Sequence, residues 1–238
     1  MLSAEHGEDM NKRLERIRMM IPDGRGVIDV GTDHGYLPVQ LAKDGYGGRI
    51  YASDIRPGPL SAAEGRAAKE GVRERITFFL CDGLDACPPQ SVDVIVIAGM
   101  GGDTICGILD RAEWCMSPDY LLILQPMTKA EVLRFWLVNN GFRIETETLV
   151  REGENLYQIL SVRFQNLNTP LSDAELYLGA RRADPLYAEH LLQQRARLET
   201  SLAGMRSAGQ SNTPHFMLLS DIVCKMNKME EELHDNGF

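Results

Sequence analysis

The chain has 238 residues, of which 44% are hydrophobic and 25% are charged, and its formal net charge is −9 at pH 7. This length predicts one sizeable domain, or one domain with an appendage. The negative charge argues against a protein that coats nucleic acid by bulk electrostatics, although it is compatible with a local basic patch. No apolar run of about 18 residues occurs, so we expect no transmembrane helix and no membrane partner.

The N-terminal segment and the cysteines bear on the cellular compartment. The first 20 residues lack the uncharged apolar stretch and cleavage site of a signal peptide, which favours a cytoplasmic protein. The number of cysteines, five, is odd, and no C-x-x-C pair occurs among them. We therefore expect free thiols rather than a disulfide framework or a zinc site. No metal site is predicted, and the sequence carries no signal for an oligomeric state.

One short segment is strongly basic. NKRLERIR, residues 11–18, places Lys12, Arg13, Arg16 and Arg18 within about two helical turns. Such a helix could hold phosphate groups, and the alternative is an ordinary solvated helix face.

Five apolar runs predict strands that are buried on both faces of a parallel sheet, because each run is continuous rather than alternating. They lie at residues 26–30, 49–54, 75–82, 92–99 and 119–126. Helical patterns separate or follow them at residues 37–45, 59–71, 102–112 and 129–141. This alternation predicts a doubly wound α/β sheet.

The pattern then changes to two adjacent strands and a helical tail. Residues 142–152 and 155–164 are joined by only two residues, which predicts an antiparallel hairpin at the sheet edge. Residues 165–172 have the composition of a linker. We therefore divide the chain into an α/β domain, residues 1–164, and a C-terminal helical domain, residues 165–238.

Leucine spacing predicts how the tail is built. Apolar residues recur at intervals of three, four and seven on both sides of the turn signal at residues 207–214. They are Leu191, Leu198, Leu202 and Met205, then Leu219, Val223, Met226 and Leu233. Such seams predict an antiparallel helical hairpin of the coiled-coil kind, and two helices lying flat on the α/β domain are the alternative.

Acidic residues mark three successive predicted strands: Asp29 lies in the first, and Asp54 and Asp82 end the second and third. In an open α/β sheet, ligands bind at the carboxyl ends of the strands. There Asp54 could accept both ribose hydroxyls of an adenosine, Asp82 could accept the exocyclic N–H of adenine, and Asp29 could meet a cation. Each alone could be an ordinary capping aspartate, but together they predict one ligand cleft.

The loop DVGTDHG, residues 29–35, has Asp33 where a dinucleotide fingerprint has its second glycine. The pyrophosphate of NAD rests on the backbone N–H groups of such a turn, and a carboxylate there would repel it. S-adenosylmethionine has an adenosine, no phosphate, and positive sulfonium and ammonium groups. The loop therefore favours S-adenosylmethionine over a dinucleotide.

The fourth predicted strand ends in IAGMGG, residues 97–102. Gly99, Gly101 and Gly102 would let the backbone approach a flat ligand closely. Tight packing between strand and helix is the alternative.

Six segments occur in order across roughly residues 12–163: RLERIRMMIPDGRGVIDVGTDHGYLP, DIRPGPLSAA, CDGL, IAGMGG, LILQP and LRFWLVNNGFRIETE. Together they resemble the bacterial tRNA (adenine-22-N1)-methyltransferases, and DHGYLP with AGMGG is the specific part. The tail is similar to the family's C-terminal coiled-coil domain in pattern alone. Two departures are visible: Gly35 stands where many members have alanine, and Met127 where many have asparagine.

The resemblance implies a class I methyltransferase sheet, S-adenosylmethionine as cofactor, and methylation of adenine N1 in tRNA. On this interpretation Asp33 is the catalytic candidate, with capping of the next helix as its alternative role. Cofactor candidates are Asp29, Gly31, Thr32, Asp54, Ile55, Asp82, Gly83 and Gly99. Substrate candidates are Arg13, Arg16, His34, Tyr36, Met100 and Gln125.

Some substrate candidates also have structural interpretations. His34 could be an ordinary loop histidine, Tyr36 could anchor the first helix of the sheet domain, and Gln125 could join the fifth strand to the loop at Pro126. Arg13 and Arg16 are expected to hold tRNA phosphates together with the helical tail.

Three other functions remain open from the sequence. A methyltransferase of the same fold could act on a small molecule or a protein. A nicotinamide oxidoreductase is disfavoured by Asp33 and by the absence of G-x-G-x-x-G. A non-catalytic binding protein could keep the same fold.

Overall fold

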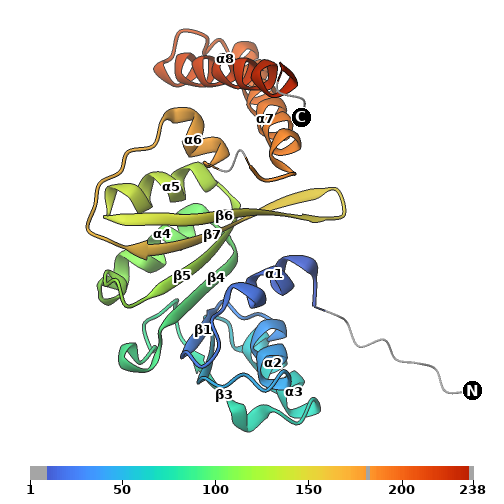
Figure 1. Cartoon of the computed structure of the whole chain (residues 1–238), viewed down its shortest axis with the longest axis vertical. Coiled ribbons are helices and arrows are strands. Elements are labelled where there is room, and N and C mark those ends of the chain that lie inside the picture. Colours follow the sequence, from blue (N-terminus) through green and yellow to red (C-terminus); the bar gives the residue numbers. More distant parts are fainter. Residues whose placement is uncertain (1–9, 181–182, 236–238) are drawn as a thin grey trace, which may run out of the picture.

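The computed structural model describes residues 10–180 and 183–235, which contain a seven-stranded sheet flanked by helices (Figure 1). The strands are β1 Val27–Val30, β2 Ile50–Asp54, β3 Ile76–Leu80, β4 Val94–Gly101, β5 Leu121–Thr128, β6 Phe142–Glu152 and β7 Asn155–Phe164. Their spatial order is β3-β2-β1-β4-β5-β7-β6. The first five are parallel, and β7 is antiparallel to β5 and β6. The predicted sheet and edge hairpin are confirmed.

Helices cover both faces of this sheet (Figure 1). They are α1 Lys12–Met20, α2 Tyr36–Lys43, α3 Pro57–Lys69, α4 Gly102–Arg111 and α5 Ala130–Asn139. Helices α1, α2 and α3 share one buried cluster, to which they contribute Ile17, Leu37 and Ala67. Helices α4 and α5 contribute Ile105 and Leu133 to the other. Every residue of β1 is buried, in agreement with its mostly apolar sequence, in which Asp29 is the one polar residue.

Observed bounds lie within two residues of the predicted ones, and α3 shows why they shift. The helix begins at Pro57 rather than at residue 59, because the fixed φ of proline suits the first helical position. After its end, Gly71 adopts a φ of 71°, a left-handed conformation that stops a helix.

The tail forms a helix pair with its own core. Helices α7 Tyr187–Ser207 and α8 Pro214–Asp235 follow the short α6 Asp173–Leu178. Arg195 pairs with Glu230 while Arg206 lies over the ring of Phe216, so α7 and α8 are antiparallel, as predicted. The buried cluster of the pair includes Leu191, Leu198, Leu202, Leu219, Ile222 and Met226. This separate core supports the predicted division after residue 164, which stays a prediction.

A buried arginine in the sheet domain bonds to the segment that contains α6 and leads to the helix pair. Arg134 of α5 is fully buried and donates to Glu147 of β6 at 2.7 Å. It also donates to the carbonyl of Leu176 in α6 at 2.7 Å, and Glu147 accepts the N–H of Ala180 at 2.9 Å. A charged residue in this position is satisfied only while the segment after the sheet stays in place.

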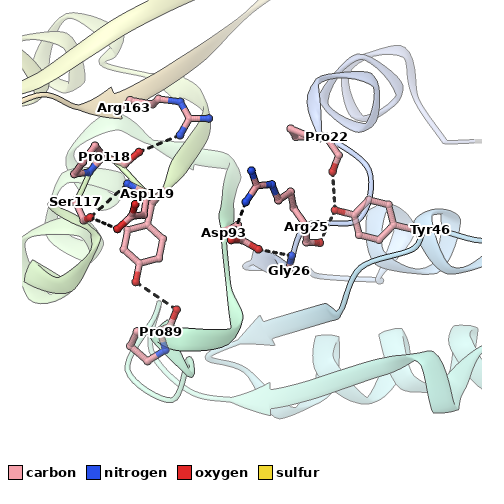
Figure 2. Close-up of polar contacts among 11 residues, drawn as sticks. Pro22, Arg25, Gly26, Tyr46, Pro89, Asp93, Ser117, Pro118, Asp119 and Arg163 are labelled. Atoms are coloured by element: carbon pink, nitrogen blue, oxygen red, sulfur yellow. Dashed lines mark hydrogen bonds and ion pairs between the residues drawn. The ribbon is translucent and has the colours of Figure 1, made fainter.

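Polar contacts also connect the loops at the amino ends of the strands, as Figure 2 shows. Asp93, before β4, accepts the N–H of Gly26 at 2.7 Å. The Tyr46 hydroxyl lies 2.9 Å from the carbonyl oxygen of Pro22 and 2.6 Å from that of Arg25. In the described ranges, no helix is long and apolar enough to cross a bilayer.

Candidate active site

The carboxyl ends of β1 to β4 open into a cavity of about 700 Å³. This volume lies within the range of roughly 300–1,000 Å³ that is usual for small-molecule sites. All eight predicted cofactor residues line it: Asp29, Gly31, Thr32, Asp54, Ile55, Asp82, Gly83 and Gly99. Asp33, Tyr36, Met100 and Arg13 line it as well. His34, Arg16 and Gln125 are not among its lining residues.

The loop after β1 is held against β2. The N–H groups of Gly31 and Thr32 donate to the Ser53 carbonyl at 2.8 and 2.9 Å. Gly31 has a φ of 70°, and a Cβ there would lie 2.1 Å from the methyl carbon of Met100. The positive φ favours glycine at this position, whereas the Met100 methyl group is the end of a flexible side chain and could move aside.

Asp29 is a buried carboxylate at the base of the cavity. Its side chain accepts the Thr32 hydroxyl at 2.7 Å. Burial raises the pKa of Asp29 to about 6, against the lowering effects of the Thr32 hydrogen bond and of the positive charge of Arg13. The carboxylate is therefore costly to ionise in the free protein, and a cation bound beside it would favour ionisation.

Asp54 fixes the backbone of the predicted catalytic residue. It is 4% exposed and accepts the N–H of Arg56 at 2.8 Å and that of Asp33 at 3.2 Å. Asp33 itself has a φ of 52°, a conformation that costs free energy in a non-glycine residue and often marks functional sites. Its exposed carboxylate lies 3.7 Å from the Arg56 guanidinium and 3.8 Å from His34 Nε2.

The loops after β2 and β3 form another side of the cavity. Asp82 pairs with Arg111 at 2.8 Å, while Ile55 is 61% exposed and offers an apolar surface. Gly83 has a φ of 58°, and a Cβ there would lie 2.9 Å from Ile108. Both the positive φ and the packing against Ile108 require glycine at this position.

The structure revises the roles of Gln125 and Arg13. Gln125 is fully buried, and its Oε1 accepts the N–H of Gly99 at 3.0 Å and an N–H of Arg13. Its Nε2 donates to the Pro126 carbonyl at 2.9 Å. The amide is thus occupied by the protein, which favours its structural role over presentation to a base. Arg13 lines the cavity, and its predicted contact with tRNA phosphates stays a prediction.

The other substrate candidates lie around the rim. His34 is exposed, and its carbonyl accepts Arg66 Nε at 3.1 Å. The Arg66 guanidinium stacks on the ring of Tyr36 at 4.0 Å, which supports the structural interpretation of Tyr36. Arg16 is half-buried on α1. Substrate roles for His34, Tyr36, Met100 and Arg16 stay predictions.

Two residues at the site, Arg56 and Tyr157, are not among those predicted from the sequence. Arg56 directly follows Asp54 and Ile55, so its position in the loop could have been noticed. Tyr157 of β7 lies under the Arg13 guanidinium, 5.5 Å from ring centroid to carbon, and no local pattern points to it. Within residues 10–180 and 183–235, no cluster of His, Cys, Asp and Glu is arranged to hold a metal ion.

Comparisons with known proteins agree with this geometry. Residues 10–160 match the family described as methyltransferase domain. The tRNA (adenine(22)-N(1))-methyltransferase of Bacillus subtilis is 32% identical over 151 residues, which are 63% of each chain. The match thus spans less than two thirds of that relative. A provisionally assigned tRNA methyltransferase of Mycoplasma pneumoniae is 31% identical over 71% of this chain and 79% of its own.

A solved structure is similar over nearly the whole chain. A provisionally assigned tRNA (m1A22) methyltransferase of Streptococcus pneumoniae, in complex with S-adenosyl-L-methionine, has a TM-score of 0.80 and 29% identity. The similarity covers 93% of this chain and 99% of that one, and so includes the helical tail. The chain therefore belongs to the methyltransferase domain family and, within it, to the tRNA (adenine-22-N1)-methyltransferase family.

Proposed function

We propose that the protein transfers a methyl group from S-adenosylmethionine to N1 of an adenine in tRNA, with adenine 22 as the target. One observation carries the proposal: the cavity at the carboxyl ends of the strands is acidic, with Asp29, Asp54 and Asp82 in its wall. Such a site suits a phosphate-free adenosyl cation. A tRNA substrate would place the protein in the cytoplasm, as the sequence analysis expects.

The residues present fit this cofactor. Asp54 keeps lone pairs for the two ribose hydroxyls while it accepts its two backbone N–H groups. Ile55 and the backbone at Gly83 would contact the adenine ring, and Asp82 would accept its exocyclic N–H. When bound, S-adenosylmethionine supplies a methyl group on a positively charged sulfur.

The chain then has to position the target base. Adenine N1 carries a lone pair, so no general base is needed to create the nucleophile. Alignment of N1 with the methyl group can lower the barrier by several kcal/mol, and by about 7–11 in the best-oriented cases. In a duplex N1 is masked by pairing, so the target nucleotide has to be unpaired or flipped out.

Asp33 is the proposed catalytic residue. The N1-methylated base is cationic, and a nearby carboxylate would stabilise this charge as it develops. Asp33 lies at the rim of the cavity, and its backbone is held by Asp54, the proposed ribose ligand. Cofactor binding and the position of Asp33 would therefore both depend on the buried carboxylate of Asp54.

A groove beside the cavity supports an RNA substrate. It has a volume of about 240 Å³ and lies between the loop after β5, the start of β7 and helix α7. Its wall includes Met127, Lys129, Asn155, Tyr157 and Arg197. Lys129 pairs with Asp103 at 2.8 Å and Arg197 with Glu131 at 3.5 Å, so the groove offers mainly polar groups to nucleotides next to the target, and the helix pair supplies one side.

The test is a transfer assay with methyl-labelled S-adenosylmethionine and an unmodified tRNA transcript. Label should enter the transcript, and reverse transcription should stop at the target, because N1-methylation blocks pairing. A transcript with uridine at position 22 is the matched control and should stay unlabelled. Asp33→Asn should reduce kcat by about 10- to 100-fold, since charge stabilisation is lost while cofactor contacts stay.

Other outcomes would contradict the proposal. Label on another nucleotide would refute the target, and transfer only to small molecules or proteins would refute the substrate class. Point variants suit this test better than deletion of the tail, because Arg134 and Glu147 inside the sheet domain bond to Leu176 and Ala180.

A further inference from the structure

Helix α6 lies between α5 and the helix pair and packs with both (Figure 1). Leu178 of α6 is fully buried in the core that α7 and α8 share. On its other side, the backbone carbonyl of Leu176 accepts the Arg134 side chain of α5 at 2.7 Å. The position of the helix pair relative to the sheet domain therefore depends on how α6 is held.

A buried network holds α6 to the sheet domain. Arg134 is 0% exposed, and its guanidinium donates through Nε to Glu147 at 2.7 Å and through Nη2 to Gln158 at 2.5 Å. The other oxygen of Glu147 accepts the N–H of Ala180, just after α6, at 2.9 Å. Both charged groups of the pair thus have one partner in the sheet domain and one in the segment that leads to the helix pair.

A buried ion pair of this kind specifies a geometry more than it stabilises a fold. Its attraction is largely offset by the cost of removing both ions from water, so an apolar pair of similar volume often gives equal stability. The network still favours one position of α6, since any other position leaves the guanidinium and the carboxylate without their partners in residues 176–180.

The same arginine reaches the groove beside the cofactor cavity. Gln158 of β7, to which Arg134 donates, lines this groove, and Arg197 of α7 lines it as well. Arg134 therefore contacts one wall directly and holds the other through α6 and the core of the helix pair. A shift of α6 would change the width of the groove. Neither Arg134 nor Glu147 lines the cofactor cavity.

We propose that Arg134, through its pair with Glu147, is a positioning residue for the tRNA, because it sets the width of the groove between the sheet domain and the helix pair. The inference rests on the proposed function for its substrate and adds a buried residue to it. A groove of fixed width binds nucleotides next to the target without first ordering the tail, so less conformational entropy is lost on binding. Removal of the pair should therefore raise the KM for tRNA and leave kcat nearly unchanged.

The decisive variant is Arg134→Met/Glu147→Leu, which replaces the ion pair by apolar side chains of similar size. No unpaired charge is left buried, so the melting temperature should stay within about 5 °C of wild type. The KM for an unmodified tRNA transcript should rise about 10-fold or more, while kcat stays within about 3-fold. Calorimetry should give an affinity for S-adenosylmethionine within about 2-fold of wild type, since the cofactor cavity is intact.

A second measurement follows α6 itself and needs no tRNA. Amide hydrogen exchange in residues 173–180 should be about 10-fold faster in the double variant, because Leu176 and Ala180 lose their partners in the sheet domain. Exchange in β1 and β4 should stay as in the wild type, which separates release of α6 from loosening of the sheet.

Arg163→Met/Glu145→Leu is the matched control, because it removes an arginine–glutamate pair from the same hairpin. Arg163 and Glu145 are partly exposed and lie 3.5 Å apart, and Arg163 also donates to the Pro118 carbonyl at 3.2 Å. These contacts connect the hairpin to the loop before β5 rather than to α6. The control should leave the KM for tRNA and the exchange of α6 within about 2-fold of wild type.

Arg134→Lys keeps the charge beside Glu147 without the planar fork that bonds in several directions. It should raise the KM for tRNA by a smaller factor than the double variant. It also provides the comparison with wild type should the double variant unfold at the assay temperature.

Three results would overturn the assignment. Unchanged exchange in residues 173–180 would mean that Arg134 and Glu147 do not hold α6. An unchanged KM for tRNA despite faster exchange would mean that the position of α6 does not matter for the substrate. A parallel loss of affinity for S-adenosylmethionine would mean that the pair only supports the fold of the sheet domain. Failure of the wild-type protein to methylate tRNA would instead refute the proposed function, and the exchange measurement would still decide whether Arg134 holds α6.

Discussion

The two ends of the parallel strands use polar residues in opposite ways. We call the side of the sheet at their amino ends the amino edge and the side at their carboxyl ends the carboxyl edge. At the amino edge, Asp93 and Tyr46 bond to neighbouring backbone groups and close the loops (Figure 2). At the carboxyl edge, Asp29 is buried with a raised pKa and Asp33 is held at a φ of 52°. One edge satisfies its polar groups internally, while the other keeps carboxylates directed at a cavity.

This difference separates stability from function along the same strands. Polar groups that are paired within the protein contribute to folding, whereas groups held for a ligand cost folding free energy until it binds. Substitutions at the amino edge should therefore change unfolding and leave cofactor affinity alone. Substitutions at the carboxyl edge should weaken cofactor binding and leave stability unchanged or higher.

The largest expected effect is at Asp54. Asp54→Ala removes the proposed ribose ligand and also the acceptor that holds the N–H of Asp33. Loss of two charge-assisted hydrogen bonds should weaken S-adenosylmethionine binding by at least about 100-fold, or about 3 kcal/mol. Isothermal titration calorimetry measures this directly. An affinity within a few-fold of wild type would remove Asp54 from the site.

Asp29 provides a test in which stability and binding move in opposite directions. Its pKa is about 6 in the folded protein, above the ordinary aspartate value of 3.8. Between these values the folded state binds the extra proton, so stability falls as pH rises from about 4 to 6 and stays low above it. Asp29→Asn, which keeps an acceptor for Thr32, should thus stabilise the protein by up to about 3 kcal/mol at pH 8.

Urea unfolding followed by tryptophan fluorescence measures this gain, because Trp114 and Trp136 both pack against the sheet core. At pH 5 the gain should be about half as large, since Asp29 is then mostly protonated in the folded wild type. The same variant should bind S-adenosylmethionine more weakly at pH 8. A variant that loses stability at pH 8 would show that the carboxylate is not strained in the free protein.

Asp93→Ala tests the amino edge. The N–H of Gly26 would lose its acceptor, and a partly buried donor without a partner costs about 1–3 kcal/mol. The midpoint of urea unfolding should fall, while the dissociation constant for S-adenosylmethionine should stay within about 2-fold of wild type. A matching loss of affinity would mean that the two edges are coupled through β1 and β4.

The sequence predicts the carboxyl edge well where neighbours in the chain decide the geometry. Asp54 is the last residue of β2 and Asp82 comes two residues after the end of β3, and parallel strands bring their carboxyl ends to one place. The loop at Gly31 and Asp33 is likewise local. For this reason every predicted cofactor residue lines the cavity.

Contacts between distant segments could not be predicted in this way. Gln125 lies near the carboxyl end of the apolar strand β5, a position that is typical of ligand-binding side chains, yet it is fully buried and bonds to Arg13 and Gly99. Arg13 lies in a basic helix, and only the packing of α1 on the sheet turns it inward. Such side-chain pairs depend on how whole elements pack, which helical periodicity does not specify.

The smallest expected effect is at Tyr46, and it isolates a single hydroxyl at the amino edge. Burial raises the pKa of Tyr46 to about 12, and its hydroxyl lies between the carbonyls of Pro22 and Arg25. Tyr46→Phe keeps the ring and should cost about 1 kcal/mol, a fall of roughly 2–4 °C in Tm. Differential scanning calorimetry resolves such a shift. Cofactor affinity should not change, and if it does, the amino edge also positions the cleft at the opposite end of the strands.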